Sequence, residues 1–209
     1  MSDDANATLR QRLRSLDAHW ASEFDEHLLV ATETRRALRQ DFARLVEVCA
    51  RAFAAGNKLM IFGNGGSAAD AQHIATEFSV RYRADRRALP AMALTAEGAT
   101  LTAVGNDLGF ERIFARQIEA LGRPGDVALG ISTSGRSRNV LLALSQARSQ
   151  GLMPVALGGG DGGQLRGLAD PCLVVPSQTV ARIQEMHLVL GQMLCGAVEI
   201  ALGLAGEEP

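Results

Sequence analysis

A chain of 209 residues has the length of one domain and can bury a sizeable core. Its hydrophobic fraction of 47% and charged fraction of 21% are ordinary for a soluble protein, and a formal net charge of -2 excludes the basic surface of a bulk DNA binder. Aromatic residues make up only 4%, which argues against a surface that stacks nucleic-acid bases.

The first residues, MSDDANATLRQRLRSLDAHW, have mixed charge and no apolar stretch of the kind that a signal peptide carries. No apolar run is long enough to span a membrane, so we expect a cytoplasmic protein without membrane or nucleic-acid partners. The cysteines, Cys49, Cys172 and Cys195, are odd in number and lack CxxC spacing. This pattern favours buried free thiols over disulfides or zinc ligands.

The N-terminal quarter of the chain has helical periodicity. Apolar residues recur every three or four positions from about residue 5 to about residue 55, beginning with Leu9 and Leu13, and no proline interrupts them. We predict two long helices that end before Gly56, a suitable C′ residue. This pair, within residues 1–55, offers more apolar surface than one small sheet needs. It is therefore expected to pack on the sheet and on a partner subunit, although burial within one chain is an equally simple reading.

From Lys58 onward, short apolar runs alternate with glycine- or serine-rich loops and helical stretches. The runs are KLMIF, PAMAL, DVALGI, MPVAL and CLVV. Near-continuous apolar strands are typical of a parallel sheet that is buried on both faces. We therefore predict an α/β fold with a five-stranded parallel sheet flanked by helices, followed by a long helix from Val180 to about Leu204. No repeat or linker divides residues 1–209, so a single domain is expected.

The loop GNGGS, residues 63–67, follows the first predicted strand and opens a helix. Glycines there let the backbone approach a ligand, and the free amides of a helix N-terminus attract an anion. The loop lacks the lysine of a P-loop and the spacing of a dinucleotide-binding motif. The alternative is a plain glycine turn with Ser67 as the N-cap.

A second loop of similar chemistry, ISTSGRS, follows the strand DVALGI. It places four hydroxyls, those of Ser132, Thr133, Ser134 and Ser137, before another helix. Hydroxyls and helix-start amides suit the three acceptor oxygens of a phosphomonoester. Serine-rich loops are also common as simple turns, but two such loops after separate parallel strands favour a phosphate site.

His73 and Glu77 stand four residues apart on the helix that GNGGS opens, so they project from one face. Their spacing alone also fits an exposed ion pair of small energetic value. The nearby phosphate-type loop favours the other reading, in which Glu77 is a general base and the pair serves proton transfer or a metal.

Four separated stretches, GNGGSAADAQHIATE, GNDLGF, ISTSGRS and ARIQEMH, occur in the order seen in SIS (sugar isomerase) proteins, and the chain resembles the phosphoheptose isomerase family from Ala31 to Leu204. The resemblance implies a flavodoxin-like three-layer sandwich and a homotetramer with active sites between subunits. It also implies conversion of sedoheptulose 7-phosphate to D-glycero-D-manno-heptose 7-phosphate, a step toward lipopolysaccharide or capsule precursors.

The resemblance also implies roles for individual residues. Phosphate is held by the four hydroxyl residues of ISTSGRS, and Glu77 is the catalytic base. The sugar is lined by Asn64, Gly65, Gly66, Ser67, Asn106, Asp107 and Gln184. One zinc ion is expected on His73, Glu77, Gln184 and a histidine eight residues after that glutamine, a position where this chain has Gln192.

Gln192 is the main departure from the family pattern. An amide is a poor zinc ligand and cannot serve as a general acid or base near pH 7, so both the zinc and the second proton-transfer group depend on this position. His187 is expected to be packed and hydrogen-bonded rather than catalytic, and Glu97 is read as a solvated residue at a helix start.

Two other functions fit the same sequence. One is a non-catalytic SIS protein that binds a replication initiator, since some such proteins also lack the final histidine. The other is an isomerase of a different sugar phosphate. The retained metal-facing residues and phosphate hydroxyls favour the heptose isomerase over both.

Overall fold

The computed structural model of the chain describes residues 12–13, 16–83 and 85–205. It contains the two predicted N-terminal helices, α2 (Leu16–Ala37) and α3 (Arg39–Ala54). Leu9 and the expected start of the first helix lie outside the described residues. Gly56 follows α3 with a φ of 80°, which confirms the predicted glycine stop.

The strands lie where the apolar runs predicted them. They are β1 (Leu59–Gly63), β2 (Ala91–Ala93), β3 (Val127–Ser132), β4 (Met153–Gly159) and β5 (Cys172–Val175). All pairings are parallel, and the order β2-β1-β3-β4-β5 is that of flavodoxin-like folds, as predicted. Because the order reverses beside β1, the loops after β1 and β3 lie next to each other at the carboxyl edge of the sheet.

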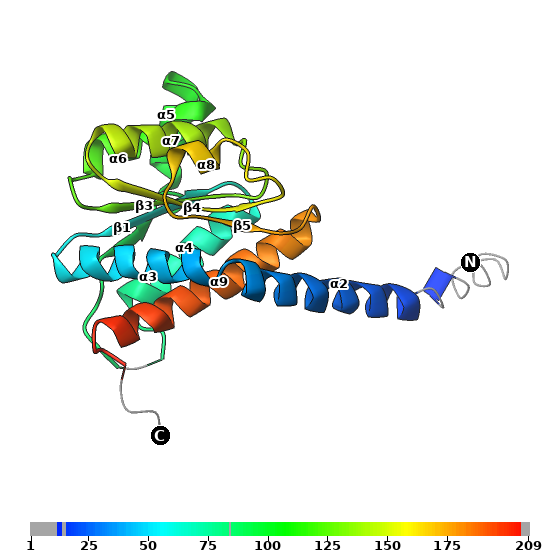
Figure 1. Ribbon diagram of the computed structural model, residues 1–209. Coiled ribbons are helices and arrows are strands. Elements are labelled where there is room, and N and C mark those ends of the chain that lie inside the picture. Colours follow the sequence, from blue (N-terminus) through cyan, green and yellow to red (C-terminus); the bar gives the residue numbers. More distant parts are fainter. Residues whose placement is uncertain (1–11, 14–15, 84, 206–209) are drawn as a thin grey trace.

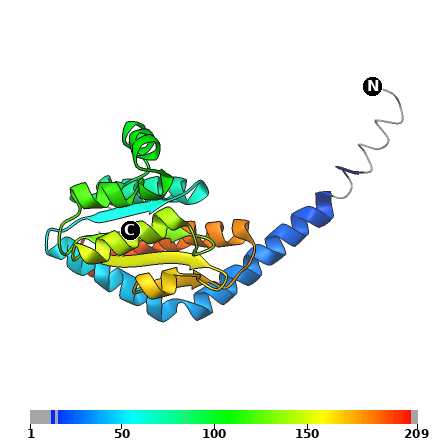
Figure 2. The same ribbon diagram turned by 90° about the horizontal axis from the view of Figure 1, so that it is seen from above.

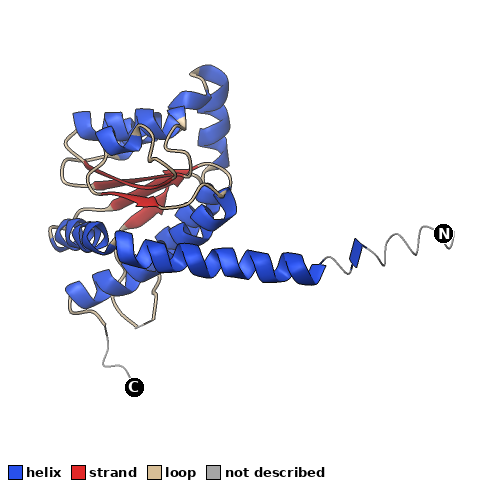
Figure 3. Cartoon of the chain, turned by 45° about the vertical axis from the view of Figure 1, so that its right-hand side comes forward, coloured by secondary structure: helices blue, strands red, loops and turns tan. Residues whose placement is uncertain are grey.

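Helices cover both faces of the sheet (Figures 1 and 2). On one face lie α3, α4 (Gly66–Ser79) and α9 (Val180–Ala201), and α2 runs outward from this layer (Figure 3). On the other face lie α5 (Gly98–Asp107), α6 (Ala115–Leu121), α7 (Arg138–Ser149) and α8 (Leu165–Leu168), together with the 3-10 helix η1 (Phe110–Arg112).

Two apolar clusters hold these layers together. The first joins α3, α4 and α9 to the sheet, with Phe53 and Phe78 in ring contact at 5.2 Å. The second lies under α6 and α7, where Phe62 meets Phe114 at 5.5 Å. Leu59, Ile61, Leu129 and Val155 face the first cluster, whereas Met60, Phe62 and Ala128 face the second, so successive strand residues serve opposite faces.

No helix in the described part of the chain is long and apolar enough to cross a membrane. Cys49 and Cys195 are buried free thiols, and Cys172 is a partly buried one, in agreement with the sequence prediction. Burial raises the pKa of the Cys49 thiol to about 12 and that of Cys172 to about 11, so both stay protonated and unreactive near neutral pH.

Candidate active site

The two loops predicted to bind phosphate are joined by a pair of side-chain amides. Asn64 Nδ2 donates to Asn139 Oδ1 at 2.9 Å, and Asn139 Nδ2 donates back to Asn64 Oδ1 at 2.8 Å. Asn139 is buried in the first turn of α7 and also accepts the backbone N–H of Val140. The Asn64 side chain, predicted to line the sugar, is therefore engaged in holding the β1–α4 loop against the start of α7.

The hydroxyls of the second loop gather around the end of β3. Ser132 is buried, and its Oγ donates to Ser137 Oγ at 3.0 Å. Thr133 is half-buried, whereas Ser134 is exposed and accepts the Arg136 backbone N–H. The Arg136 guanidinium forms an ion pair with Asp161 at 2.6 Å on the surface, so its charge is paired with a carboxylate of the neighbouring loop.

The first loop contributes buried and exposed groups to the same edge. Helix α4 begins after Gly65, whose φ is 56° and whose position provides no side-chain cap. The alternative in which Ser67 is the N-cap is therefore wrong, because Ser67 lies inside the first turn, 3% exposed. The Gln184 amide of α9 packs directly on Gly66, so a Cβ at this position would displace the end of that side chain.

His73 and Glu77 project from one face of α4 as predicted. Their closest approach is 3.2 Å, between His73 Nε2 and Glu77 Oε1. Side-chain exposures of 46% for His73 and 23% for Glu77 leave both open to a ligand. The Gln192 amide nitrogen lies 2.5 Å from the same Nε2 of His73, so residue 192 reaches the site within one chain.

Gln184 and Gln192 both face α4, since the first covers Gly66 and the second touches His73. Helix α9 thus brings one neutral amide to the glycine loop and another to His73. The contact of Gln192 with His73 and the contact of Gln184 with the glycine loop place the possible proton-transfer groups beside the loop predicted to hold the substrate.

The donor groups do not fit a tightly bound zinc ion. His73 and Glu77 are ordinary zinc donors, whereas Gln184 and Gln192 supply only amides, and Gln192 occupies the His73 nitrogen that a metal would need. Among residues 12–13, 16–83 and 85–205, no group of three or more His, Cys, Asp or Glu side chains is placed to hold a metal ion.

His187 is a packed core residue, as expected. It is fully buried, and its Nε2 donates to the Gly158 carbonyl oxygen at 3.0 Å. Burial lowers the pKa of His187 to about 4, so the ring is neutral at physiological pH. It cannot replace the missing histidine as a proton-transfer group, because it does not reach the surface of the site.

Asn106 and Asp107 are hydrogen-bonded to each other. Both are exposed at the end of α5, where Asn106 Nδ2 donates to Asp107 Oδ1 at 2.7 Å. Within the described residues, their side chains make no other hydrogen bond, and none to the loops after β1 or β3. Glu97 accepts the backbone N–H of Ala99 at the start of α5, in agreement with the helix-start reading.

Two polar residues near the site were not singled out from the sequence. For Asn139 the only signal in the sequence was weak: it is an asparagine at a predicted helix start, two residues after the serine-rich loop. Asp70 stands three residues before His73 on α4, and its Oδ2 is buried without a hydrogen bond in the described structure. Burial raises the pKa of Asp70, an effect that the charge of His73 opposes.

Comparison with known proteins gives consistent matches. A family model for the SIS domain matches residues 21–159. The phosphoheptose isomerase of Paramagnetospirillum magneticum is 58% identical over 174 residues, which cover 83% of this chain and 91% of the relative. Phosphoheptose isomerase GmhA from Neisseria gonorrhoeae matches in structure with a TM-score of 0.84 at 38% identity, covering 88% of this chain and 99% of that one. A phosphoheptose isomerase from Francisella tularensis matches with a TM-score of 0.82 at 37% identity, covering 89% and 98%.

Proposed function

The chain belongs to the phosphoheptose isomerase family of SIS-domain proteins, and we propose that it converts sedoheptulose 7-phosphate to D-glycero-D-manno-heptose 7-phosphate. The product would serve the synthesis of lipopolysaccharide or capsule heptose. One observation carries the proposal: the glycine-rich and serine-rich loops meet at one edge of the sheet, with a partly exposed imidazole and carboxylate, His73 and Glu77, on the helix that starts there.

The phosphate end of the substrate is assigned to the loop between β3 and α7. Ser132, Thr133, Ser134 and Ser137 supply hydroxyls, and the first turn of α7 adds free backbone N–H groups. These donors and the positive end of the helix dipole match a phosphomonoester. The exposed glycines of the β1–α4 loop leave room for the sugar chain beside Gln184.

The reaction itself moves two protons. Glu77 takes a proton from C1 of the ketose, and the electron pair forms the C1–C2 double bond of an enediol while the C2 oxygen gains a proton. Glu77 then returns a proton to C2 as the C1 oxygen loses one, which leaves the aldehyde. His73, next to Glu77, or a water molecule in the open site carries the proton between the two oxygens.

Zinc remains a prediction of the family resemblance. The steps above use only side chains and water, and the amide of Gln192 beside His73, in place of a histidine, favours weak binding of any Zn²⁺ ion. We therefore propose substoichiometric zinc in the purified protein.

We also propose a homotetrameric, cytoplasmic enzyme. Support for assembly comes from α2, which projects outward and exposes Leu16, Trp20, Phe24 and Leu28 along one stripe. A large apolar stripe on a projecting helix is typical of a protein interface. Active sites between subunits, as the resemblance implies, would follow from a partner that covers this layer of the molecule.

A different observation supports each of the two alternative functions. A non-catalytic SIS protein that binds a replication initiator is favoured by Gln192, because binding a partner protein does not require the missing histidine. An isomerase for another sugar phosphate is compatible with the same loops, because they recognise the phosphate rather than the number of carbons. The open proton-transfer pair on α4 favours the heptose isomerase.

The test is incubation of the purified protein with sedoheptulose 7-phosphate, with and without added zinc, followed by separation of ketose and aldose phosphates. We expect the aldose in both samples. Binding without product under either condition would contradict the enzyme and support the non-catalytic alternative. Product only from a ketose phosphate of different length would support the other isomerase.

A further inference from the structure

The proposed chemistry depends on how two helices are held against each other. Helix α4 carries His73 and Glu77, and α9 carries Gln184 and Gln192. Catalytic groups act together only when their geometry is fixed to within about 0.5 Å, so whatever fixes α4 against α9 also sets the site.

In the middle of this contact the Ile74 side chain of α4 packs directly on Gly191 of α9. A Cβ on Gly191 would lie 2.5 Å from Ile74 Cδ1, so Gly191 lets α9 settle directly onto α4. Ile74 is next to His73 and Gly191 is next to Gln192, which explains how the amide reaches the imidazole.

The far end of the contact contains a buried ion pair that the mechanism above does not use. Arg86, in the segment after α4, donates from Nε to Glu199 Oε1 on α9 at 2.8 Å. The two side chains are only 2% and 3% exposed. Glu199 also accepts the backbone N–H of Tyr82 at 3.3 Å.

The two terminal nitrogens of Arg86 donate to the last turn of α4, and Nη1 also donates to the carbonyl oxygens of Val80 and Arg87 just after it. Nη2 donates to the carbonyl oxygen of Glu77 at 2.8 Å, and Nη1 donates to that of Phe78 at 2.8 Å. Terminal carbonyls of a helix lack partners within the helix and form the negative end of its dipole, so a guanidinium satisfies them and opposes their charge. One planar group therefore holds the backbone of Glu77 on one side and α9 on the other.

We propose that Arg86 and Glu199 are positioning residues for the isomerisation, which fix Glu77 relative to the amides on α9. This inference rests on the proposed function. A buried ion pair adds little net stability over apolar residues of the same volume, so stability alone does not account for it. A hydrogen bond from the guanidinium to the Glu77 carbonyl is a contribution that an apolar pair cannot make.

The test compares the wild type with the double variant Arg86→Met, Glu199→Leu, which removes both charges together. We expect a folded protein with a KM for sedoheptulose 7-phosphate within about threefold of the wild type, since the phosphate loops are untouched, and a kcat lowered about 10- to 100-fold. The control is Lys58→Met, which removes an ion pair with Asp126 at the opposite edge of the sheet and should leave kcat unchanged.

Two further measurements keep the inference testable. Arg86→Lys keeps the charge but not the planar guanidinium, so we expect this variant to fold and to have a kcat between those of the wild type and the double variant. If the double variant does not fold, a wild-type kcat in Arg86→Lys overturns the proposal. Hydrogen exchange of the Val80 amide, which bonds to the Thr76 carbonyl in the last turn of α4, should be faster in the double variant.

The outcomes separate the two claims. A folded double variant with unchanged kcat overturns the positioning role while the proposed function stands. A wild type that makes no aldose phosphate overturns the proposed function. The exchange experiment then tests the positioning role of Arg86 and Glu199 by itself: equal protection of the Val80 amide in wild type and double variant overturns that role.

Discussion

Gln192 is the residue on which the chemistry of the site depends most. Its amide touches His73, where an imidazole would complete a zinc site with His73 and Glu77. For Gln192→His we expect zinc to rise toward one ion per chain by elemental analysis. We also expect kcat to rise by about 100-fold or more, within the roughly 10²- to 10⁴-fold range that a general acid–base group supplies.

The control for this substitution is Gln40→His, an exposed position on α3 that should gain neither zinc nor activity. Unchanged zinc and kcat in Gln192→His would show that the contact with His73 is structural and that residue 192 takes no part in the reaction.

His187 provides a prediction on pH. Its pKa is lowered to about 4 in the folded chain from an ordinary 6.5, so the unfolded chain binds more protons between these values. The contribution of neutral His187 to the free energy of unfolding is complete above about pH 6.5. It falls by up to about 3 kcal/mol as the pH drops toward 4. Urea unfolding at pH 7 and pH 5 measures this loss.

His187→Gln retains a donor for the Gly158 carbonyl but does not titrate. We expect it to be less pH-dependent than the wild type, whereas the exposed control His19→Gln should behave as the wild type does. Equal pH dependence in wild type and His187→Gln would place the titration elsewhere.

At the scale of elements, the amide pair between Asn64 and Asn139 ties the start of α4 to the start of α7. Asn139→Ala leaves the Asn64 amide without its partner, at a cost of about 1–3 kcal/mol in the free energy of unfolding. Because the pair orders both loops, we expect KM for the phosphosugar to rise about tenfold, as measured by steady-state kinetics.

Gln146→Ala is a matched control on the same helix, since Gln146 pairs with Gln150 away from the loops. It should leave KM at the wild-type value. If Asn139→Ala lowers stability without raising KM, the loops are ordered independently of the amide pair.

The elements were predictable from the sequence because local patterns specify them. Five apolar runs gave five strands, and glycine or serine marked the loops that follow β1 and β3. The side-chain partners were not predictable in the same way. Asn64 meets Asn139 across 75 positions and His73 meets Gln192 across 119, and neither pairing leaves a periodic signal. Spacing on a helix indicated which residues share a face, but not which side chains from other elements contact that face.

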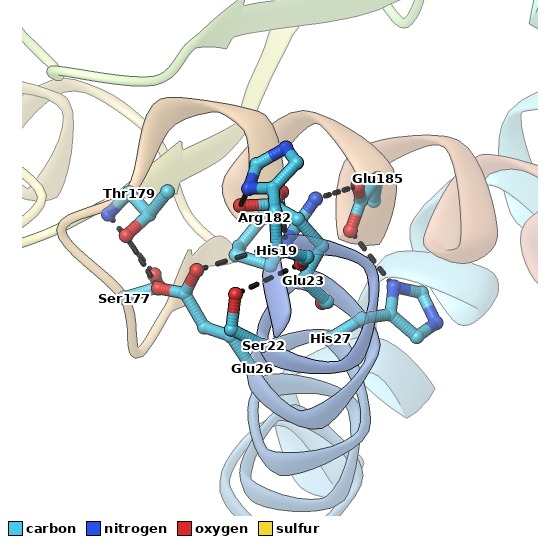
Figure 4. Close-up of polar contacts among 9 residues, drawn as sticks. All are labelled: His19, Ser22, Glu23, Glu26, His27, Ser177, Thr179, Arg182 and Glu185. Atoms are coloured by element: carbon cyan, nitrogen blue, oxygen red, sulfur yellow. Dashed lines mark hydrogen bonds and ion pairs between the residues drawn. The ribbon is translucent and has the colours of Figure 1, made fainter. Parts of the chain in front are cut away.

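At the scale of the whole molecule, α2 is held to α9 by several polar contacts from Glu23 onward and projects beyond them (Figure 1). Arg182 on α9 donates to Glu23 at 3.0 Å, and His27 lies 2.8 Å from Glu185 (Figure 4). The buried residues of α2 are Val30 and Thr34, both in its second half. In its first half Glu23 and Glu26 contact the start of α9, but the apolar side chains there are not covered by the same chain. Trp20 and Phe24, whose rings lie 4.9 Å apart, are 69% and 52% exposed there.

An apolar stripe of this kind is stabilised when a second copy covers it, which is the basis for expecting a tetramer. Light scattering coupled to size exclusion should give a mass near four chains for the wild type. Trp20→Glu with Leu28→Glu should shift the mass toward smaller species, since charges would have to be buried in the interface. Arg51→Ser, an exposed change on α3, should leave the mass unchanged. A wild type that stays monomeric at micromolar concentration would mean that the stripe has another partner and that each site is complete within one chain.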